Sequence, residues 1–268
     1  MNSASLARIV AMQRWVQEAT ASRIEPWRFG SAIFTEDFPG RYDSNFLRVE
    51  QPLGATTPAA LAAEADRVQV GLGHREVTVE NAAEGARLAA GFRDLGYIVE
   101  RLAYMALLAE PTDGPAMAVR EVGPDALRPT LLATNLAIAG MSRADAEMLA
   151  DFRPVSAARA GTRYFAVEID GVLASYCELY LHDGAAQVED VNTLEAFRNR
   201  GAGRAVVLAA IAAARAAGAD LIWLLADADD WPQNLYARLG FAQVGGAWQF
   251  TKMAPQHREM QGAAASAP

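Results

Sequence analysis

The segment from Val188 to Arg204 reads VEDVNTLEAFRNRGAGR and decides how the rest of the chain is interpreted. Its first residues predict a strand that ends at Thr193, a short loop follows, and an alanine-rich helix begins at Gly203. Gly201 and Gly203 carry no Cβ, so the backbone N–H groups at this helix start can turn toward one point. Unpaired N–H groups and the positive end of a helix dipole together make a binding place for an anion such as a phosphate.

Three arginines, Arg198, Arg200 and Arg204, bring positive charge to the same loop. The chain as a whole is acidic, with 24 Lys and Arg against 32 Asp and Glu and a formal net charge of −8. General nucleic-acid binding, which needs clustered positive charge, is therefore not expected. Taken alone, the loop fits a phosphate site and a glycine-assisted helix start with solvated arginines equally well.

The elements around this loop predict an α/β fold with a mixed sheet. We expect a strand, two helices, three strands, the alanine-rich helix, a strand, a helix and a last strand or hairpin, in that order, at residues 118–122, 124–139, 143–152, 163–169, 173–181, 186–193, 203–217, 221–226, 231–239 and 241–253. The three successive strands are joined by the turns Asp170-Gly171 and Asp183-Gly184. This part of the chain therefore accounts for a complete domain.

The residues before it predict a smaller α/β unit of their own. Its expected helices and strands lie at residues 5–20, 28–35, 45–50, 57–72, 75–80, 81–95 and 97–108. The segment 110–115, EPTDGP, has the composition of a linker. We thus expect an N-terminal domain over 1–110, a second domain over 116–254 and a disordered tail over 255–268. The first 20 residues lack the unbroken apolar run of a signal peptide or membrane span, so a soluble, cytoplasmic protein is expected.

The two units share a short internal repeat. FRDLGY at 92–97 aligns with YARLGF at 236–241, and in each unit a strand and a helix precede the repeat and a strand follows it. The shared glycine takes the left-handed conformation that ends a helix, and the flanking apolar side chains pack on the sheet. Such helix stops also recur by chance, so two interpretations stay open: the smaller unit is a truncated copy of the larger one, or the similarity is coincidental.

The second unit resembles the GNAT superfamily of acetyl-CoA-dependent N-acetyltransferases. Arg198-Asn-Arg-Gly201-Ala-Gly203 matches the pyrophosphate loop of that family, in which Arg or Gln is followed by x-x-Gly-x-Gly/Ala. Asn234-Leu-Tyr-Ala-Arg-Leu-Gly-Phe241 is similar to the second family signature, and the order of elements over 118–253 matches the family fold. The resemblance covers about half of the chain and implies a GNAT-like fold there.

The resemblance also implies roles for individual residues. The loop would bind the pyrophosphate of acetyl-CoA, the strand before it would hydrogen-bond the pantetheine arm, and Asn234 would steady that arm. Tyr236 would be the general acid that returns a proton to the departing CoA thiolate, since a tyrosine hydroxyl is protonated at neutral pH. The cofactor-binding residues implied are Val191, Asn192, Thr193, Arg198, Asn199, Arg200, Gly201, Ala202, Gly203, Arg204 and Asn234.

A general base is the least determined part of the site. An amine must lose a proton before it attacks a thioester, and Glu189, on the strand that borders the thioester in the family, is the first candidate. Asp190 points to the opposite face if the strand is regular, and a water relay is a further alternative. The smaller unit has no cofactor motif and has Phe92 where the second has Tyr236, so its expected role is to cover the sheet edge and shape an acceptor pocket. Its candidate pocket-lining aromatics are Trp15, Trp27, Phe38 and Tyr42, although core packing accounts for them equally well.

The expected function is transfer of an acetyl group from acetyl-CoA to a primary amine of a small molecule, by direct attack in a ternary complex. A regulatory module that binds acetyl-CoA without turnover and an enzyme that acetylates a protein or peptide amine are the alternatives. The expected partners are acetyl-CoA and an amine acceptor, without nucleic acid, membrane or metal. The sequence leaves the oligomeric state open, a homodimer included.

Overall fold

The computed structural model describes residues 3–111, 114–229 and 232–253. Within these ranges the strands form one continuous eleven-stranded sheet in the order β1-β2-β3-β4-β11-β5-β10-β9-β8-β7-β6. Parallel and antiparallel neighbours both occur, so the expected α/β class with a mixed sheet is confirmed. The expected tail, 255–268, lies outside the described residues.

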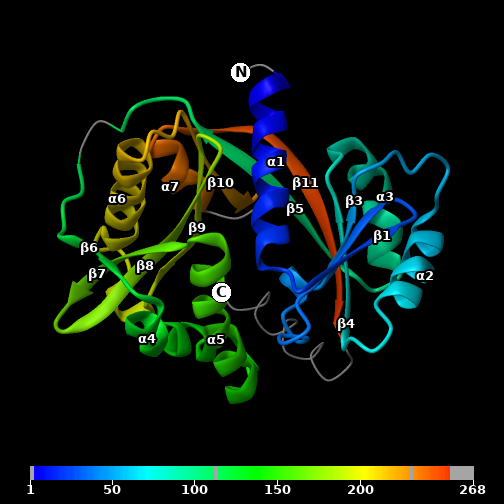
Figure 1. The fold of residues 1–268 in the computed structure, drawn as a ribbon, viewed down its shortest axis with the longest axis horizontal. Helices are drawn as coiled ribbons and strands as arrows, with labels where there is room; N and C mark the ends of the chain where they lie inside the picture. Colours follow the sequence, from blue (N-terminus) through cyan, green and yellow to red (C-terminus); the bar gives the residue numbers. More distant parts are fainter. Residues whose placement is uncertain (1–2, 112–113, 230–231, 254–268) are drawn as a thin grey trace.

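The elements follow one another in the order shown in Figure 1. They are α1 (Ser3–Thr20), β1 (Arg23–Trp27), β2 (Gly30–Phe34), η1 (Tyr42–Ser44), β3 (Phe46–Val49), α2 (Pro58–Val68), β4 (His74–Val79), α3 (Ala82–Asp94), β5 (Ile98–Leu107), β6 (Val119–Val122), α4 (Pro124–Leu136), α5 (Arg143–Ala160), β7 (Arg163–Ile169), β8 (Val172–His182), β9 (Ala185–Thr193), η2 (Glu195–Phe197), α6 (Ala202–Ala216), β10 (Leu221–Asp227), α7 (Pro232–Arg238) and β11 (Phe241–Met253).

The two faces of the sheet are covered by different helices. On β5, Val99 packs into the cluster under α2 and α3, whereas Ala103 packs into the cluster under α6 and α7. These two residues are an even number of positions apart, so the four helices share one face. Tyr104 points to the other face and meets Ile9 and Met12 of α1, which crosses the middle of the molecule (Figure 1). Helices α4 and α5 cover the rest of that second face.

Each unit contributes a strand to the interior of the other. β5, from the smaller unit, lies between β10 and β11, and β11, from the larger unit, lies between β4 and β5. β11 is a single 13-residue strand rather than a hairpin, and it pairs with β5 from Phe241 to Thr251 and with β4 from Trp248 to Met253. The backbone hydrogen bonds of the sheet therefore join both units.

The two units also share an order of elements. In the first, β3 and β4 are parallel and α2 connects them, and α3 and β5 follow. In the second, β9 and β10 are parallel and α6 connects them, and α7 and β11 follow. The sequence repeat contains a glycine after α3 and another after α7. Both glycines are in the left-handed conformation, with φ of 76° at Gly96 and 94° at Gly240. This shared order agrees with a truncated repeat.

Helix α5 is longer than the sequence predicted. The helix contains Pro154, and a proline inside a helix removes a hydrogen bond and usually ends or kinks the helix, at a cost of about 3 kcal/mol. The helix instead continues to Ala160. Tertiary contacts of the extension offset this cost, because Ser156 is fully buried and Arg153 forms two ion pairs with the sheet. The correction matters because Arg153 belongs to the functional site.

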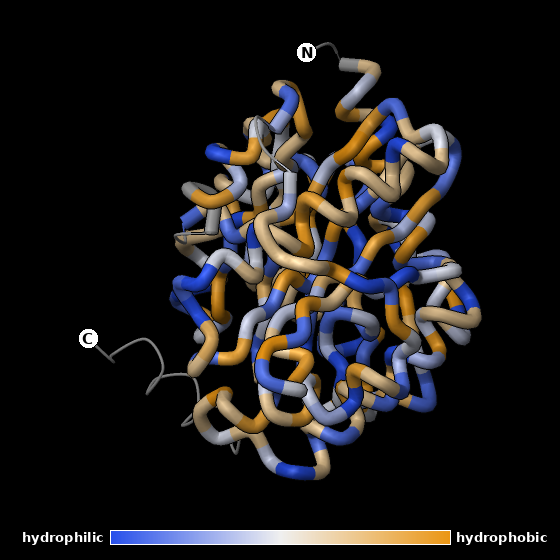
Figure 2. The backbone as a smooth tube through the Cα atoms, turned by 90° about the vertical axis from the view of Figure 1, so that its left-hand side faces the viewer, coloured by the Kyte–Doolittle hydropathy of each residue, from blue (hydrophilic) through white to orange (hydrophobic). Residues whose placement is uncertain are grey.

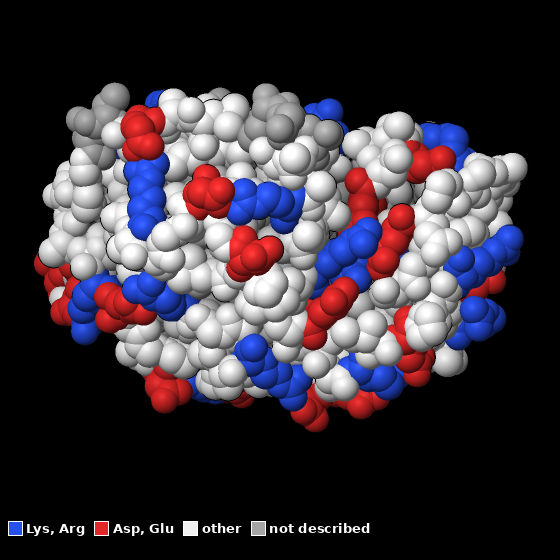
Figure 3. All heavy atoms as spheres, turned by 45° about the horizontal axis from the view of Figure 1, so that its top comes forward, with Lys and Arg blue, Asp and Glu red and all other residues white. Residues whose placement is uncertain are grey.

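Apolar and polar residues alternate along most elements, so that orange and blue sections follow each other along the tube in Figure 2. The apolar sides of these elements form the buried clusters between the sheet and its helices. On the face seen in Figure 3, basic and acidic side chains lie beside each other in small mixed groups. Among the described residues, we find no helix that combines the length and the apolar character of a membrane span.

The contribution of β11 to the core of the first unit gives a stability prediction. Phe250 is fully buried in that core and stacks on Phe92 with 4.2 Å between ring centroids. We expect Phe250→Ala to lower the free energy of unfolding by about 3–5 kcal/mol, the usual cost of removing a buried phenylalanine. Urea unfolding followed by tryptophan fluorescence measures this loss.

The matched control is Val70→Ala, because Val70 is 78 % exposed. We expect it to change the free energy of unfolding by less than about 0.5 kcal/mol. A loss for Phe250→Ala as small as that of the control would contradict the assignment of β11 to the core of the first unit.

Candidate functional site

The site begins where two parallel strands part. β9 and β10 are paired from Ala185 and Leu221 up to Val188 and Leu224, yet both strands continue beyond this point. The rest of β10 stays paired with β5, and the rest of β9 with β8. Beyond this point the backbone groups on the facing edges of β9 and β10 do not pair with each other. A ligand that binds like an added strand requires such unpaired groups.

The loop after β9 presents an open set of backbone N–H groups. Gly201 has φ of 85°, a left-handed conformation that favours glycine, and it precedes the first residue of α6, Ala202. No heavy atom lies within 4 Å of the position that a Cβ of Gly201 would occupy. Within the described part of the chain, the backbone N–H groups of residues 199–203 donate no hydrogen bond, and no side chain caps the helix. This arrangement leaves an accessible cluster of donors at the positive end of a 15-residue helix.

The side chains around the loop fix its position. Gly203 lies close to β9, because a Cβ there would stand 3.3 Å from Oγ1 of Thr193. Oγ of Ser175, on β8, lies 2.9 Å from the same Thr193 atom and donates to the carbonyl of Asn192 at 2.8 Å. Arg198 donates from Nε to the carbonyl of Thr193 at 3.3 Å. These contacts therefore hold the start of α6 against the end of β9, next to the loop that joins them.

The other two arginines of the loop contact its periphery. The guanidinium of Arg200 lies over the ring of Phe197 and donates to the carbonyl of Ala196 at 3.2 Å. Arg204 donates to the carbonyl of Gly114 at 3.3 Å. Both keep their charge near the open N–H groups, which favours an anionic ligand.

Asp190 corrects the expectation of a regular strand. The pairing of β8 with β9 shifts between Tyr176 and Glu178, and Asp190 has φ of 47°. This bulge places one extra residue on β9, so the alternation of side chains is broken. Glu189 and Asp190 consequently line the same cavity instead of pointing to opposite faces.

Asp190 is engaged by several partners. Its carboxylate forms an ion pair with Arg153 of α5 and accepts a hydrogen bond from the Tyr176 hydroxyl at 3.2 Å. Nδ2 of Asn192 donates to its other oxygen at 2.6 Å. Arg153 also pairs with Glu178 at 2.7 Å, so two carboxyl groups share one buried cation.

Glu189 has no such cation. Its carboxyl group accepts a hydrogen bond from Nε2 of Gln187 at 2.6 Å, and the backbone of Asp190 also hydrogen-bonds to it. Burial, followed by the nearby charges of Glu178 and Asp190, raises the pKa of the Glu189 carboxyl to about 8. A carboxyl group with this pKa can accept and release a proton close to neutral pH.

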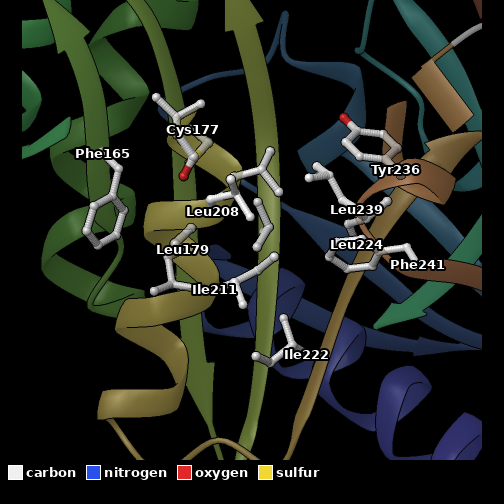
Figure 4. Packing of buried hydrophobic residues seen from close by; sticks show 14 of the residues in the cluster. Phe165, Cys177, Leu179, Leu208, Ile211, Ile222, Leu224, Tyr236, Leu239 and Phe241 are labelled. Carbon is white, nitrogen blue, oxygen red and sulfur yellow. The ribbon is translucent and has the colours of Figure 1, made fainter. Parts of the chain in front are cut away.

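Tyr236 lies on α7, on the opposite face of the sheet from the cavity. It is 8 % exposed, belongs to the cluster under α6 and α7, and meets Phe241 edge to face. Its hydroxyl points away from the apolar side chains of that cluster (Figure 4) and has no hydrogen-bond partner among the described residues. Burial, followed by the charges of Glu189, Cys177 and Asp190, raises the pKa of Tyr236, so the hydroxyl is protonated at neutral pH. Asn234 lies on the same helix, and its side chain is outside the described part of the chain.

A cavity of about 270 Å³ lies on the face covered by α1. Its walls come from both units: α1, η1, β3, β4 and β5 from the first, and α5, β8, β9, β10 and β11 from the second. Glu189, Asp190 and Leu225 reach it from the part of β9 and β10 where the strands no longer pair. The cavity thus adjoins the opening in the sheet.

Several residues of the cavity were not found from the sequence. The four aromatics expected to line it do not do so; Trp15 stacks on His182, and Phe38 packs edge to face on Phe152. The charged residues that do line it, apart from Glu189 and Asp190, are Arg41, Asp43, Arg48, Glu76, Glu80, Arg153 and Glu178. One signal was present in the sequence, because the polar Glu76, Thr78 and Glu80 alternate with the apolar Val77 and Val79.

Comparison with known proteins agrees with this geometry. Residues 134–241 match the sequence model of the acetyltransferase (GNAT) family. No curated protein sequence matches the chain. Among solved structures, a conserved protein of unknown function from Staphylococcus epidermidis is similar, with a TM-score of 0.67, 16 % identity, and coverage of 87 % of this chain and 94 % of that one.

Two further structures are similar over most of the chain. A GCN5-related N-acetyltransferase from Kribbella flavida has a TM-score of 0.59 and 18 % identity, covering 94 % of this chain and 96 % of that one. A tandem GNAT protein from the clavulanic acid biosynthesis pathway has a TM-score of 0.50 and 17 % identity, covering 77 % and 74 %. At these identities the similarity concerns the fold, whereas the family match concerns the sequence itself. Residues 134–241 are thus an acetyltransferase domain of the GNAT family, and the protein that carries it is an acyltransferase.

Proposed function

We propose that the protein transfers an acetyl group from acetyl-CoA to a primary amine of a small molecule. One observation carries the proposal: Tyr236 and Glu189 lie on the two sides of the opening between β9 and β10. The open N–H groups of residues 199–203 lie at the end of the same strand, and the cavity lies beside Glu189. A cofactor reaching through the opening would thus meet an acid on one side and a base on the other.

The residues present fit the cofactor. The N–H groups of residues 199–203 suit a pyrophosphate, which needs several donors at one point and no blocking side chain. The unpaired inner edge of β9, at Val191 to Thr193, suits the amide-containing pantetheine arm, which binds like an added strand. When bound, acetyl-CoA supplies an activated acetyl group, and all other steps fall to the protein.

The proposed roles of the two catalytic residues follow from their environments. Glu189, as carboxylate, accepts a proton from the acceptor ammonium, and the neutral nitrogen then forms a bond with the acetyl carbon. The bond between that carbon and sulfur breaks, and the Tyr236 hydroxyl donates its proton to the sulfur. The nitrogen loses its second proton as it becomes an amide, and this proton restores the Tyr236 hydroxyl. Asp190 is held by Arg153, Tyr176 and Asn192, which favours Glu189 over Asp190 as the base. Direct attack in a ternary complex requires no covalent enzyme intermediate.

The cavity supports a small acceptor. At about 270 Å³ it lies at the lower end of the range of small-molecule pockets, roughly 300–1,000 Å³. α1 forms part of its wall through Gln13, Val16, Gln17 and Thr20, which leaves little room for a folded protein. The two alternatives are a protein or peptide acceptor and a sensor that binds acetyl-CoA without turnover, and thiol release with different acceptors distinguishes them.

Gly201→Glu tests cofactor binding. The new side chain brings bulk and negative charge to the open N–H groups, so we expect acetyl-CoA binding to fall below detection in isothermal titration calorimetry. The matched control is Gly123→Glu, the same change at the glycine that caps α4, where binding should be retained. Circular dichroism of both variants confirms folding, and acetyl-CoA binding by folded Gly201→Glu would contradict the assignment of the loop.

Tyr236→Phe tests the general acid. We expect kcat to fall by about 100-fold or more, the usual contribution of a positioned acid, while acetyl-CoA affinity stays nearly unchanged. Tyr97→Phe is the control, since Tyr97 is also a buried tyrosine but belongs to the core of the first unit. Thiol release and calorimetry give the two quantities. An unchanged kcat of Tyr236→Phe removes Tyr236 from the mechanism. If the wild-type protein binds acetyl-CoA but releases no thiol with any of a panel of amines, the result supports a sensor.

The pKa of Glu189 predicts a pH dependence. The base acts as carboxylate and its pKa is raised to about 8, so kcat/KM should increase about tenfold per pH unit below 8 and level off above it. Glu189→Gln should lower kcat/KM by about 100-fold or more and remove this limb, leaving the dependence that belongs to the acceptor amine itself. If kcat/KM of the variant still rises with pH up to about 8, the base is a group other than Glu189.

A further inference from the structure

The carboxyl groups of the cavity divide into those with and those without a cation. Asp43 pairs with Arg41 at 2.8 Å, Glu80 pairs with Arg14, and Arg153 pairs with both Glu178 and Asp190. Glu76 and Glu189 have no ion-pair partner within the described residues. The two unneutralised groups come from different units, Glu76 from β4 and Glu189 from β9.

Glu76 is a buried carboxyl group without a partner. Its exposed fraction is 0 %, and neither Oε1 nor Oε2 has a hydrogen bond with the described residues. Burial, together with the charges of Glu100 and Asp43, raises the pKa of Glu76 well above its ordinary value, although Thr251 and Gln249 nearby act in the opposite direction. A buried group of this kind is costly unless a ligand satisfies it.

The remaining polar lining is also rich in hydrogen-bond acceptors. Oε1 of Gln187, next to Glu189 on the same face of β9, is buried and has no partner in the described part of the chain. The cavity therefore offers an unused oxygen atom next to Glu189, in addition to the oxygens of Glu76. Donors that carry positive charge, such as ammonium groups, complement such a surface.

The spacing of the two carboxyl groups favours a long ligand. β10, β5 and β11 lie between β9 and β4, so four strand steps of about 4.8 Å each separate the strands that carry Glu189 and Glu76. A linear amine with several charges along its chain can reach both groups, whereas a short monoamine reaches one. A chain without branches also suits a cavity of about 270 Å³.

We propose that the acceptor is a linear polyamine, whose reacting amino group lies at Glu189 while a distant ammonium group is bound by Glu76. This inference rests on the proposed function and adds the substrate class to it. Glu76 acts in binding and does not touch the reacting atoms. The smaller unit thus contributes the part of the acceptor site that recognises the second charge.

The experiment compares a linear tetra-amine, spermine, with n-butylamine as acceptors, using thiol release. We expect kcat/KM for spermine to exceed that for n-butylamine by at least 10-fold, and Glu76→Gln to reduce this ratio by about 10- to 100-fold, the loss expected for one hydrogen bond between charged groups. The matched control, Asp94→Asn, removes a carboxyl group at the exposed end of α3 that does not line the cavity, and should leave the ratio unchanged. Thermal unfolding of both variants verifies that they are folded.

Calorimetric titration of spermine into the protein without acetyl-CoA separates acceptor binding from transfer. Binding to the wild-type protein and the Asp94→Asn variant, with a loss in Glu76→Gln, supports the polyamine site even when no acetyl transfer occurs and the proposed function fails. Acetylation of both amines with equal efficiency, or an equal effect of Glu76→Gln on both, overturns the polyamine proposal and leaves the proposed function in place.

Discussion

The opening between β9 and β10 depends on how the outer edges of these strands are held. Beyond Val188 and Leu224 the two strands no longer pair with each other, but β8 holds β9 and β5 holds β10. β5 belongs to the smaller unit, so the part of β10 that borders the opening is fixed by hydrogen bonds from the other half of the chain. The smaller unit therefore supports the sheet at the site as well as forming one wall of the cavity.

The charges around the opening differ in how they are neutralised, and this difference assigns their chemistry. Glu178 and Asp190 share the cation of Arg153, whereas Glu189 has hydrogen bonds but no ion-pair partner among the described residues. A buried carboxyl group beside two other acids holds its proton more tightly, which brings its pKa into the range where a base works at neutral pH. Arg153 lies on the part of α5 that continues past Pro154, so the length of that helix is a condition for this distribution of charge.

The two units keep a common order of elements but differ where the chemistry lies. In the larger unit α6 starts at Gly201 without a side-chain cap, whereas in the smaller unit Thr57 caps α2 by accepting a hydrogen bond from the N–H of Ala60, and Pro58 has no N–H. Phe92, which aligns with Tyr236, is fully buried and has no proton to donate. The smaller unit thus shares the order of elements but has neither an uncapped helix start nor a hydroxyl at these two positions.

The sequence by itself determined the elements of the larger unit and the residues of the loop, because periodicity, glycines and helix stops are local signals. Its resemblance to a family also made Tyr236 and Glu189 the candidates for the catalytic acid and base. Only the tertiary structure decided three features: β5 and β11 each lie in the part of the sheet that the other unit forms, a bulge is present at Asp190, and one cavity is lined by both Glu76 and Glu189. Each depends on pairing between segments that are distant in the chain, and the alternation within one strand cannot specify which neighbour it meets or where an extra residue shifts its register.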